Sequence, residues 1–159
     1  MPVRRTTAGA PRESGFTLVE ALVALVILAI GMLGIAALYI EGLRASRAAL
    51  IRTEAVTLAA DLADRIRINR DGGASYAGTA ATAPNANCLP GGAGCDPADL
   101  AAHDLRVWLD SIAAALPGGT GTVVRTDPVT TDEIFLYTIT VNWTEAGQGA
   151  LSYTLRVET

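Results

Sequence analysis

The carboxylate of Glu20 is the side chain in this sequence whose surroundings most restrict its chemistry. It lies four residues after Phe16 and directly before twenty consecutive uncharged residues, Ala21 to Ile40. A carboxylate that enters an apolar environment is costly in free energy, so it usually marks a function or a specific partner. The expected chemistry is neutralisation by a cation, because a buried charge without a partner is strongly destabilising.

The other reactive side chains do not form a catalytic set. His103 is the only histidine and has no obvious nucleophile beside it, which favours a structural histidine over a catalytic one. The sequence has no glycine-rich phosphate loop and no paired acids with a catalytic signature. We therefore expect no enzymatic activity and no cofactor.

Two groups of residues raise the question of a metal. Six residues separate Cys88 from Cys95 in a Gly/Pro-rich stretch, which is too few cysteines for zinc and suits a small disulfide in an oxidising compartment. Asp127, Asp132 and Glu133 could suggest calcium, but an acid-rich turn is the favoured interpretation. We expect no metal.

Charge and hydropathy define the elements that must position Glu20. Arginine supplies all twelve basic residues and the formal net charge is -4, which argues against a nucleic-acid surface. Residues 1–15 carry Arg4, Arg5 and Arg12 against one acid, so this segment should stay on the cytoplasmic side of a membrane. Residues 16–40 then form one apolar helix, whose uncharged part rises about 30 Å and matches one bilayer span. A secretory signal peptide would have a shorter apolar core.

Helical periodicity continues through residues 41–70, so a helix is predicted from about Phe16 to Asn69. Asp71 to Gly73 should end it. The predicted apolar face of this continuation consists of Leu43, Leu50, Ile51, Ala55, Leu58, Leu62 and Ile66.

Residues 71–159 should form a separate head. Residues 71–95 lack periodicity and are predicted to be a long loop, followed by a helix from Pro97 to Leu116 with Asp96 as its N-cap. Strands are predicted at Thr122–Thr126, Ile134–Trp143 and Leu151–Val157, the last two forming a hairpin around Glu145 to Gly149. The expected fold class is α+β, a long N-terminal helix packed on a small antiparallel sheet with one additional helix.

The run G-F-T-L-V-E, from Gly15 to Glu20, resembles the signal of type IV prepilins. The resemblance implies a type IV pilin-like fold and cleavage between Gly15 and Phe16 by a prepilin peptidase, which removes residues 1–15 as a leader. The same enzyme would then N-methylate the new Phe16 amine. It also implies that Glu20 docks the subunit during assembly by pairing with the Phe16 amine of an adjacent subunit.

A second resemblance concerns A-A-D-L-A-D-R-I-R-I-N-R, from Ala59 to Arg70, together with the segment from Val23 to Ala36. These segments are similar to the PilV class of type IV minor pilins, also called pilus modification proteins. The acids and arginines of the later segment, Asp61, Asp64, Arg65 and Arg67, fit a solvated face with a pair between Asp61 and Arg65, and a direct subunit contact is the alternative.

The PilV resemblance implies a tip or priming complex with other minor pilins and the major pilin, in contact with an inner-membrane assembly platform and with a possible tip adhesin. It also implies a role in adhesion or twitching motility, with the head in the periplasm of a Gram-negative-type bacterium before assembly and in the pilus afterwards. A GspI-like minor pseudopilin of type II secretion is the alternative, and a membrane-tethered binding protein outside any filament is a third possibility.

Overall fold

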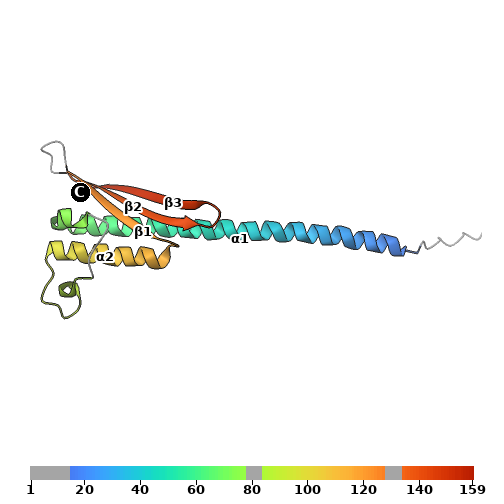
Figure 1. Cartoon of the computed structure of the whole chain (residues 1–159), viewed down its shortest axis with the longest axis horizontal. Coiled ribbons are helices and arrows are strands. Elements are labelled where there is room, and N and C mark those ends of the chain that lie inside the picture. Colours follow the sequence, from blue (N-terminus) through green and yellow to red (C-terminus); the bar gives the residue numbers. More distant parts are fainter. Residues whose placement is uncertain (1–14, 78–83, 128–133) are drawn as a thin grey trace, which may run out of the picture. The chain divides into compact units, whose positions relative to one another are not determined.

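The computed structural model describes residues 15–77, 84–127 and 134–159. Helix α1 (Leu18–Ile68) is followed by two 3-10 helices, η1 (Arg70–Tyr76) and η2 (Ala86–Cys88), and by helix α2 (Pro97–Ala115). Strands β1 (Thr120–Thr126), β2 (Leu136–Glu145) and β3 (Gly149–Glu158) complete the chain (Figure 1). This order confirms the α+β fold class, with a long N-terminal helix, a small antiparallel sheet and an additional helix.

The chain divides into two units, Met1–Arg44 and Ala45–Thr159, and α1 contributes residues to both. In the first unit every described residue is exposed, including the large apolar side chains. In the second unit α1 supplies one wall of a hydrophobic core.

The core face of α1 consists largely of small residues. Ala55, Ala59, Leu62, Ala63 and Ile66 are buried, at helical spacings of three and four residues. Leu50 is 71% exposed, so its predicted place on the apolar face is wrong. Leu43, in the first unit, is also exposed. Alanine was given too little weight in that prediction, because a small side chain lets neighbouring elements approach the helix closely and then becomes completely buried.

The three strands form one antiparallel sheet in the order β1-β2-β3. In β2 the side chains alternate, so that Tyr137, Ile139, Val141 and Trp143 face the core. The predicted hairpin is present, since Glu145 pairs with Gly149, whose φ of +80° suits glycine. The core-facing residues of β3 are less covered, and only Val157 is fully buried there.

Helix α2 begins as predicted and ends one residue early. The Asp96 carboxylate accepts a hydrogen bond of 2.7 Å from the Asp99 N–H, the geometry of an N-cap. Trp108 is 1% exposed, and its Nε1–H donates to the Leu58 carbonyl of α1 at 2.8 Å. Gly121 of β1 lies against the same indole, since a Cβ at that position would come within 2.5 Å of the Trp108 ring. Helix α2 therefore joins α1 to the sheet.

The interpretation of residues 71–95 as one long loop was wrong in part. The segment Arg70–Tyr76 is a 3-10 helix, interrupted at Gly73, where φ is +40°, and Tyr76 is completely buried. The position of η1 depends on contacts with α2, and local periodicity in the sequence does not indicate such contacts. Residues 78–83 lie outside the described residues.

Candidate functional site at the start of the long helix

Thr17 positions the first turn of α1. Its Oγ1 accepts a hydrogen bond from the Glu20 N–H at 3.3 Å, and its carbonyl accepts from the Ala21 N–H at 3.2 Å. A hydroxyl that satisfies a free amide in this way acts as a helix N-cap. This role of Thr17 was not predicted, although the spacing T-x-x-E of Thr17 and Glu20 is the pattern of a capping box and indicates it.

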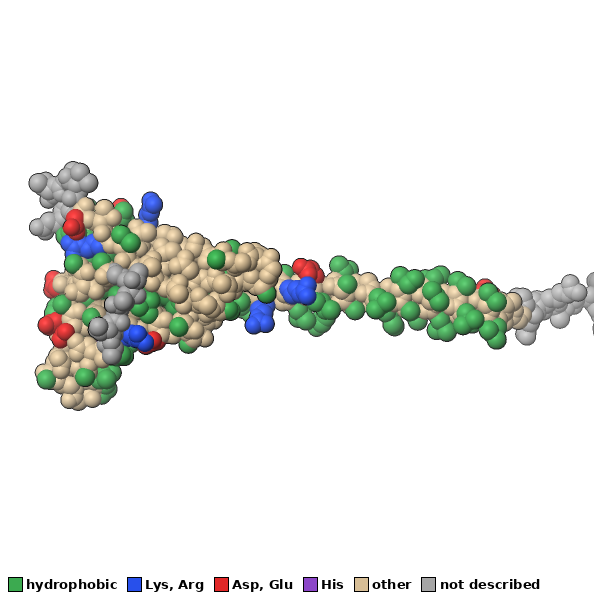
Figure 2. Space-filling view, in the orientation of Figure 1, with side chains coloured by type: hydrophobic (Ala, Val, Ile, Leu, Met, Phe, Trp, Pro, Cys, Tyr) green, Lys and Arg blue, Asp and Glu red, His purple; other side chains and the backbone are tan. Residues whose placement is uncertain are grey.

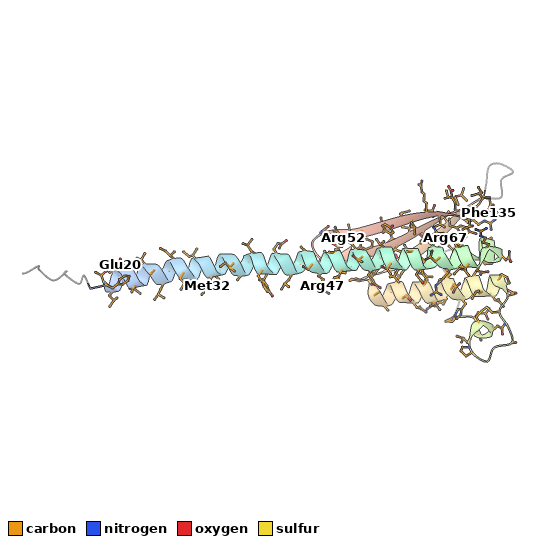
Figure 3. All side chains as sticks on the ribbon, turned by 180° about the vertical axis from the view of Figure 1, so that it is seen from behind. Glu20, Met32, Arg47, Arg52, Arg67 and Phe135 are labelled. Carbon is orange, nitrogen blue, oxygen red and sulfur yellow. A yellow bond between two sulfur atoms is a disulfide. The ribbon has the colours of Figure 1, made fainter. Side chains whose placement is uncertain are left out.

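The capped turn leaves the candidate processing and docking residues accessible. Gly15 and Phe16 precede α1, and the Phe16 side chain is 73% exposed. Glu20 is exposed within the first turn, as Figure 3 shows together with Met32 further along the helix. Residues 15–40 contain no basic side chain that could neutralise the Glu20 carboxylate within this segment.

The rest of this part of α1 is an apolar surface without a covering layer. Its large apolar side chains are all more than half exposed, and Figure 2 shows hydrophobic side chains along the helix. The helix is long and apolar enough to cross a membrane by length and composition. So much exposed apolar surface needs lipid or other apolar helices around it.

In the second unit, a bidentate ion pair joins α1 to the end of β2. Arg52 donates from Nε and from a terminal nitrogen to the two Glu145 carboxylate oxygens, both at 3.1 Å, and also to the Gln148 side chain at 2.9 Å. The Trp143 indole N–H donates to the same carboxylate at 3.1 Å, and the Glu145 side chain is 5% exposed. The hydrogen bonds from Arg52 lower the pKa of Glu145, although burial opposes the effect, and the Trp143 hydrogen bond also contributes.

This ion pair predicts how stability depends on pH. Because the pKa of Glu145 is lower in the folded chain, its contribution is complete above the ordinary carboxyl pKa and is lost as the pH falls through the lowered value. Replacement by Gln should remove that acid-dependent part of the stability. Denaturant titrations of the head between about pH 7 and about pH 3 measure it. Glu158→Gln, on the exposed end of β3, is the matched control and should leave the profile unchanged. An unchanged profile in Glu145→Gln would contradict the assignment.

A second polar cluster connects the end of α1 with η1 and α2. Arg65 donates to Asp61 at 2.9 Å, as predicted, and also to Asp104 of α2 at 2.7 Å. The Tyr76 hydroxyl donates to the same Asp104 carboxylate at 2.9 Å, and burial raises the pKa of Tyr76. Asn69 donates to the Tyr76 hydroxyl at 3.1 Å and to the Pro97 carbonyl at 2.8 Å. Arg65 is therefore a structural residue of the head as well as a member of a solvated face.

The remaining candidate residues lie apart from these clusters. Cys88 and Cys95 form a disulfide with Cα atoms 4.9 Å apart in an exposed part of the head. The Nδ1 atom of His103 is buried and has no hydrogen-bond partner within the described residues. Asp132 and Glu133, considered for calcium, lie outside them, and no group of three metal-binding side chains occurs in residues 15–77, 84–127 and 134–159.

Comparison with known families agrees with this geometry. Residues 10–36 match the prokaryotic N-terminal methylation motif, and residues 37–106 match the family model described as type IV pilin Tt1218. The long N-terminal helix and the small antiparallel sheet match the type IV pilin fold, and the two family matches make the chain similar to type IV pilins that carry an N-terminal methylation motif. Within that class the match is to the Tt1218-like family. No curated protein and no solved structure matches the chain.

These findings define the function at a coarse level. The type IV pilin family is structural rather than enzymatic, and the methylation motif implies processing by a prepilin peptidase. The apolar helix fits a membrane-anchored pilin that becomes part of a pilus.

Proposed function

We propose that the chain is a minor pilin of the PilV class that helps to initiate type IV pilus assembly within a tip or priming complex. The observation that carries the proposal is the methylation motif on an apolar helix whose first turn is capped by Thr17 and leaves Glu20 exposed. Prepilin peptidase cleaves between Gly15 and Phe16, removes residues 1–15, and methylates the Phe16 amine. Residues 1–14 lie outside the described residues, whereas both residues at the cleavage site are accessible.

Glu20 is the docking residue in this proposal. Cleavage creates an α-amino cation at Phe16, and the carboxylate of Glu20 in a neighbouring subunit neutralises it. The absence of any basic side chain in residues 15–40 supports a partner from another chain or from the new N-terminus. Pairing lowers the cost of holding either charge among apolar helices.

The proposed location and partners follow the same order of events. The head occupies the periplasm of a Gram-negative-type cell while residues 16–40 hold the subunit in the inner membrane. At the assembly platform the subunit joins other minor pilins and then the major pilin, with a possible adhesin at the tip. Adhesion and twitching motility are the processes that the filament would support.

The segment Ala59–Arg70 supports the PilV class through the architecture of the head. Leu62, Ala63 and Ile66 enter the core, and Arg65 and Asn69 bond to η1 and α2. The residues that carry the resemblance are therefore the ones that attach α1 to the head of this chain. A GspI-like pseudopilin of type II secretion is the alternative, and a secretion defect with normal pili after gene deletion would favour it.

Mass spectrometry of the protein in sheared filaments tests processing and incorporation together. We expect a mature chain that begins at N-methylated Phe16. A chain that begins at Met1, or that is absent from filaments although it is present in the membrane, would contradict the proposal and favour a membrane-tethered binding protein. An unmethylated Phe16 in filaments would contradict only the methylation step.

A further inference from the structure

The face of the sheet that points away from the core carries a regular array of hydroxyl groups. Because β2 and β3 bury their odd-numbered residues, their even-numbered residues lie on the opposite face, and the register places β1 likewise. Thr122, Thr140 and Thr154 are direct cross-strand partners, and so are Thr120, Asn142 and Ser152. These two complete rows form the surface that we call the threonine face: Thr120, Thr122, Thr140, Asn142, Ser152 and Thr154.

The threonine face is accessible and uncharged. Thr120, Ser152 and Thr154 are exposed and the other members are partly exposed. Figure 2 shows mostly uncharged surface over the strands. The next row along the strands is Val124, Thr138 and Arg156, so an exposed valine and a charged side chain border the array on that side.

Most hydroxyl groups of this face remain available for a ligand. Thr140 and Thr154 share a hydrogen bond of 3.3 Å, and it is the one hydrogen bond that side chains of the array make with the described part of the chain. Each hydroxyl can both donate and accept. Within a row, side chains on neighbouring strands lie about 4.8 Å apart, and successive rows follow one another about 6.8 Å apart along the strands.

The composition of the threonine face identifies the class of partner that it can bind. A nucleic acid or another polyanion requires basic side chains, and a membrane requires apolar ones. Interfaces between proteins are enriched in aromatic residues and arginine and contain less serine than other surfaces. The array contains no basic, aromatic or large apolar side chain, and it contains one serine. A neutral polymer that itself presents hydroxyl donors and acceptors at close intervals complements it in charge and in hydrogen bonding.

We propose that the threonine face binds a neutral polysaccharide surface. The hydroxyl groups of adjacent sugars exchange hydrogen bonds with successive rows of the array, directly or through water. Individual contacts are weak, so binding depends on both rows acting together. This inference does not depend on the PilV assignment, because it concerns the head as it stands in the isolated chain.

The experiment measures retention of the detergent-solubilised full chain on cellulose and cross-linked dextran particles. The triple variant Thr122→Val, Thr140→Val, Thr154→Val removes one complete row of hydroxyls while keeping β-branched side chains that suit a strand. Its retention should fall about tenfold, since it loses several hydrogen-bond groups at once. Circular dichroism establishes that the head remains folded.

The matched control removes hydroxyl groups elsewhere on the head. Thr53→Val with Thr57→Val deletes two hydroxyls of α1 that bond to their own helix, and retention should be unchanged. No retention of the unmodified chain, equal retention of the triple variant, or stronger retention on polygalacturonate would each overturn the proposal. A change in the self-association of the triple variant in sedimentation experiments would also overturn it, because a second copy would then be the partner.

Discussion

Glu20→Val is expected to reduce the amount of this protein in sheared filaments by about two orders of magnitude. Leaving one member of a buried charge pair without its partner costs about 3–5 kcal/mol, which corresponds to a factor of more than about one hundred in an equilibrium constant. The loss falls on the assembled state, where the Phe16 amine of the neighbouring subunit would lie among apolar helices. Cleavage and membrane insertion should be normal, because valine extends the apolar segment. Quantitative immunoblots of filament and membrane fractions measure the ratio.

Glu41→Val is the matched control for Glu20→Val. Glu41 lies on the same helix, is exposed, and forms only a surface pair with Arg44 at 3.5 Å. Surface pairs of this kind contribute little to stability, so incorporation should change by less than about threefold. Normal incorporation of Glu20→Val would contradict the docking role. An equal loss in both variants would show that the helix tolerates neither change and would also contradict a specific role for Glu20.

Trp108→Ala is expected to destabilise the head by about 3–5 kcal/mol, a large share of the stability of a small domain. The indole is buried between α1 and β1, and the Leu58 carbonyl loses its hydrogen-bond donor when the ring is removed. Neighbouring elements cannot close such a space without moving, because protein cores are densely packed. Denaturant titration of the detergent-solubilised chain, followed by the fluorescence of Trp143, measures the change.

Two further variants separate the packing role of Trp108 from its hydrogen bond. Trp108→Phe keeps most of the ring and removes the N–H, so a smaller loss of about 1–2 kcal/mol is expected. Leu100→Ala changes the same helix at a position that is 36% exposed, and should cost about 1 kcal/mol or less. A Trp108→Ala variant as stable as Leu100→Ala would show that α2 does not join α1 to the sheet through this residue.

Local patterns predicted most of the secondary structure. Asp96 followed by Pro97 is a local signal for a helix start, and α2 begins at Pro97. Apolar residues alternate with polar ones in β2, a two-residue period that indicates a strand, and the structure buries Tyr137, Ile139, Val141 and Trp143. The N-cap role of the Thr17 hydroxyl could also have been predicted, because Thr17 and Glu20 have the three-residue spacing of a capping box.

The long-range polar contacts could not be predicted in the same way. Arg52 lies among several charged residues of α1, yet it bonds to Glu145, ninety-three residues later in the chain. Asp104 showed no local partner, yet it receives hydrogen bonds from Arg65 and Tyr76. Helical spacing indicates which residues share a face, but it does not indicate which distant element covers that face.

The segment that contains Glu20 illustrates what the sequence by itself determined. The order of Gly15, Phe16 and Glu20 before an apolar run is local information, and it was sufficient to indicate a prepilin signal because a peptidase and a membrane both act on contiguous residues. The tertiary structure decided which residues attach α1 to the head and which face of the sheet carries exposed hydroxyl rows. Those features arise when distant segments pack together, since burial and cross-strand register are properties of the folded chain and not of any single stretch of it.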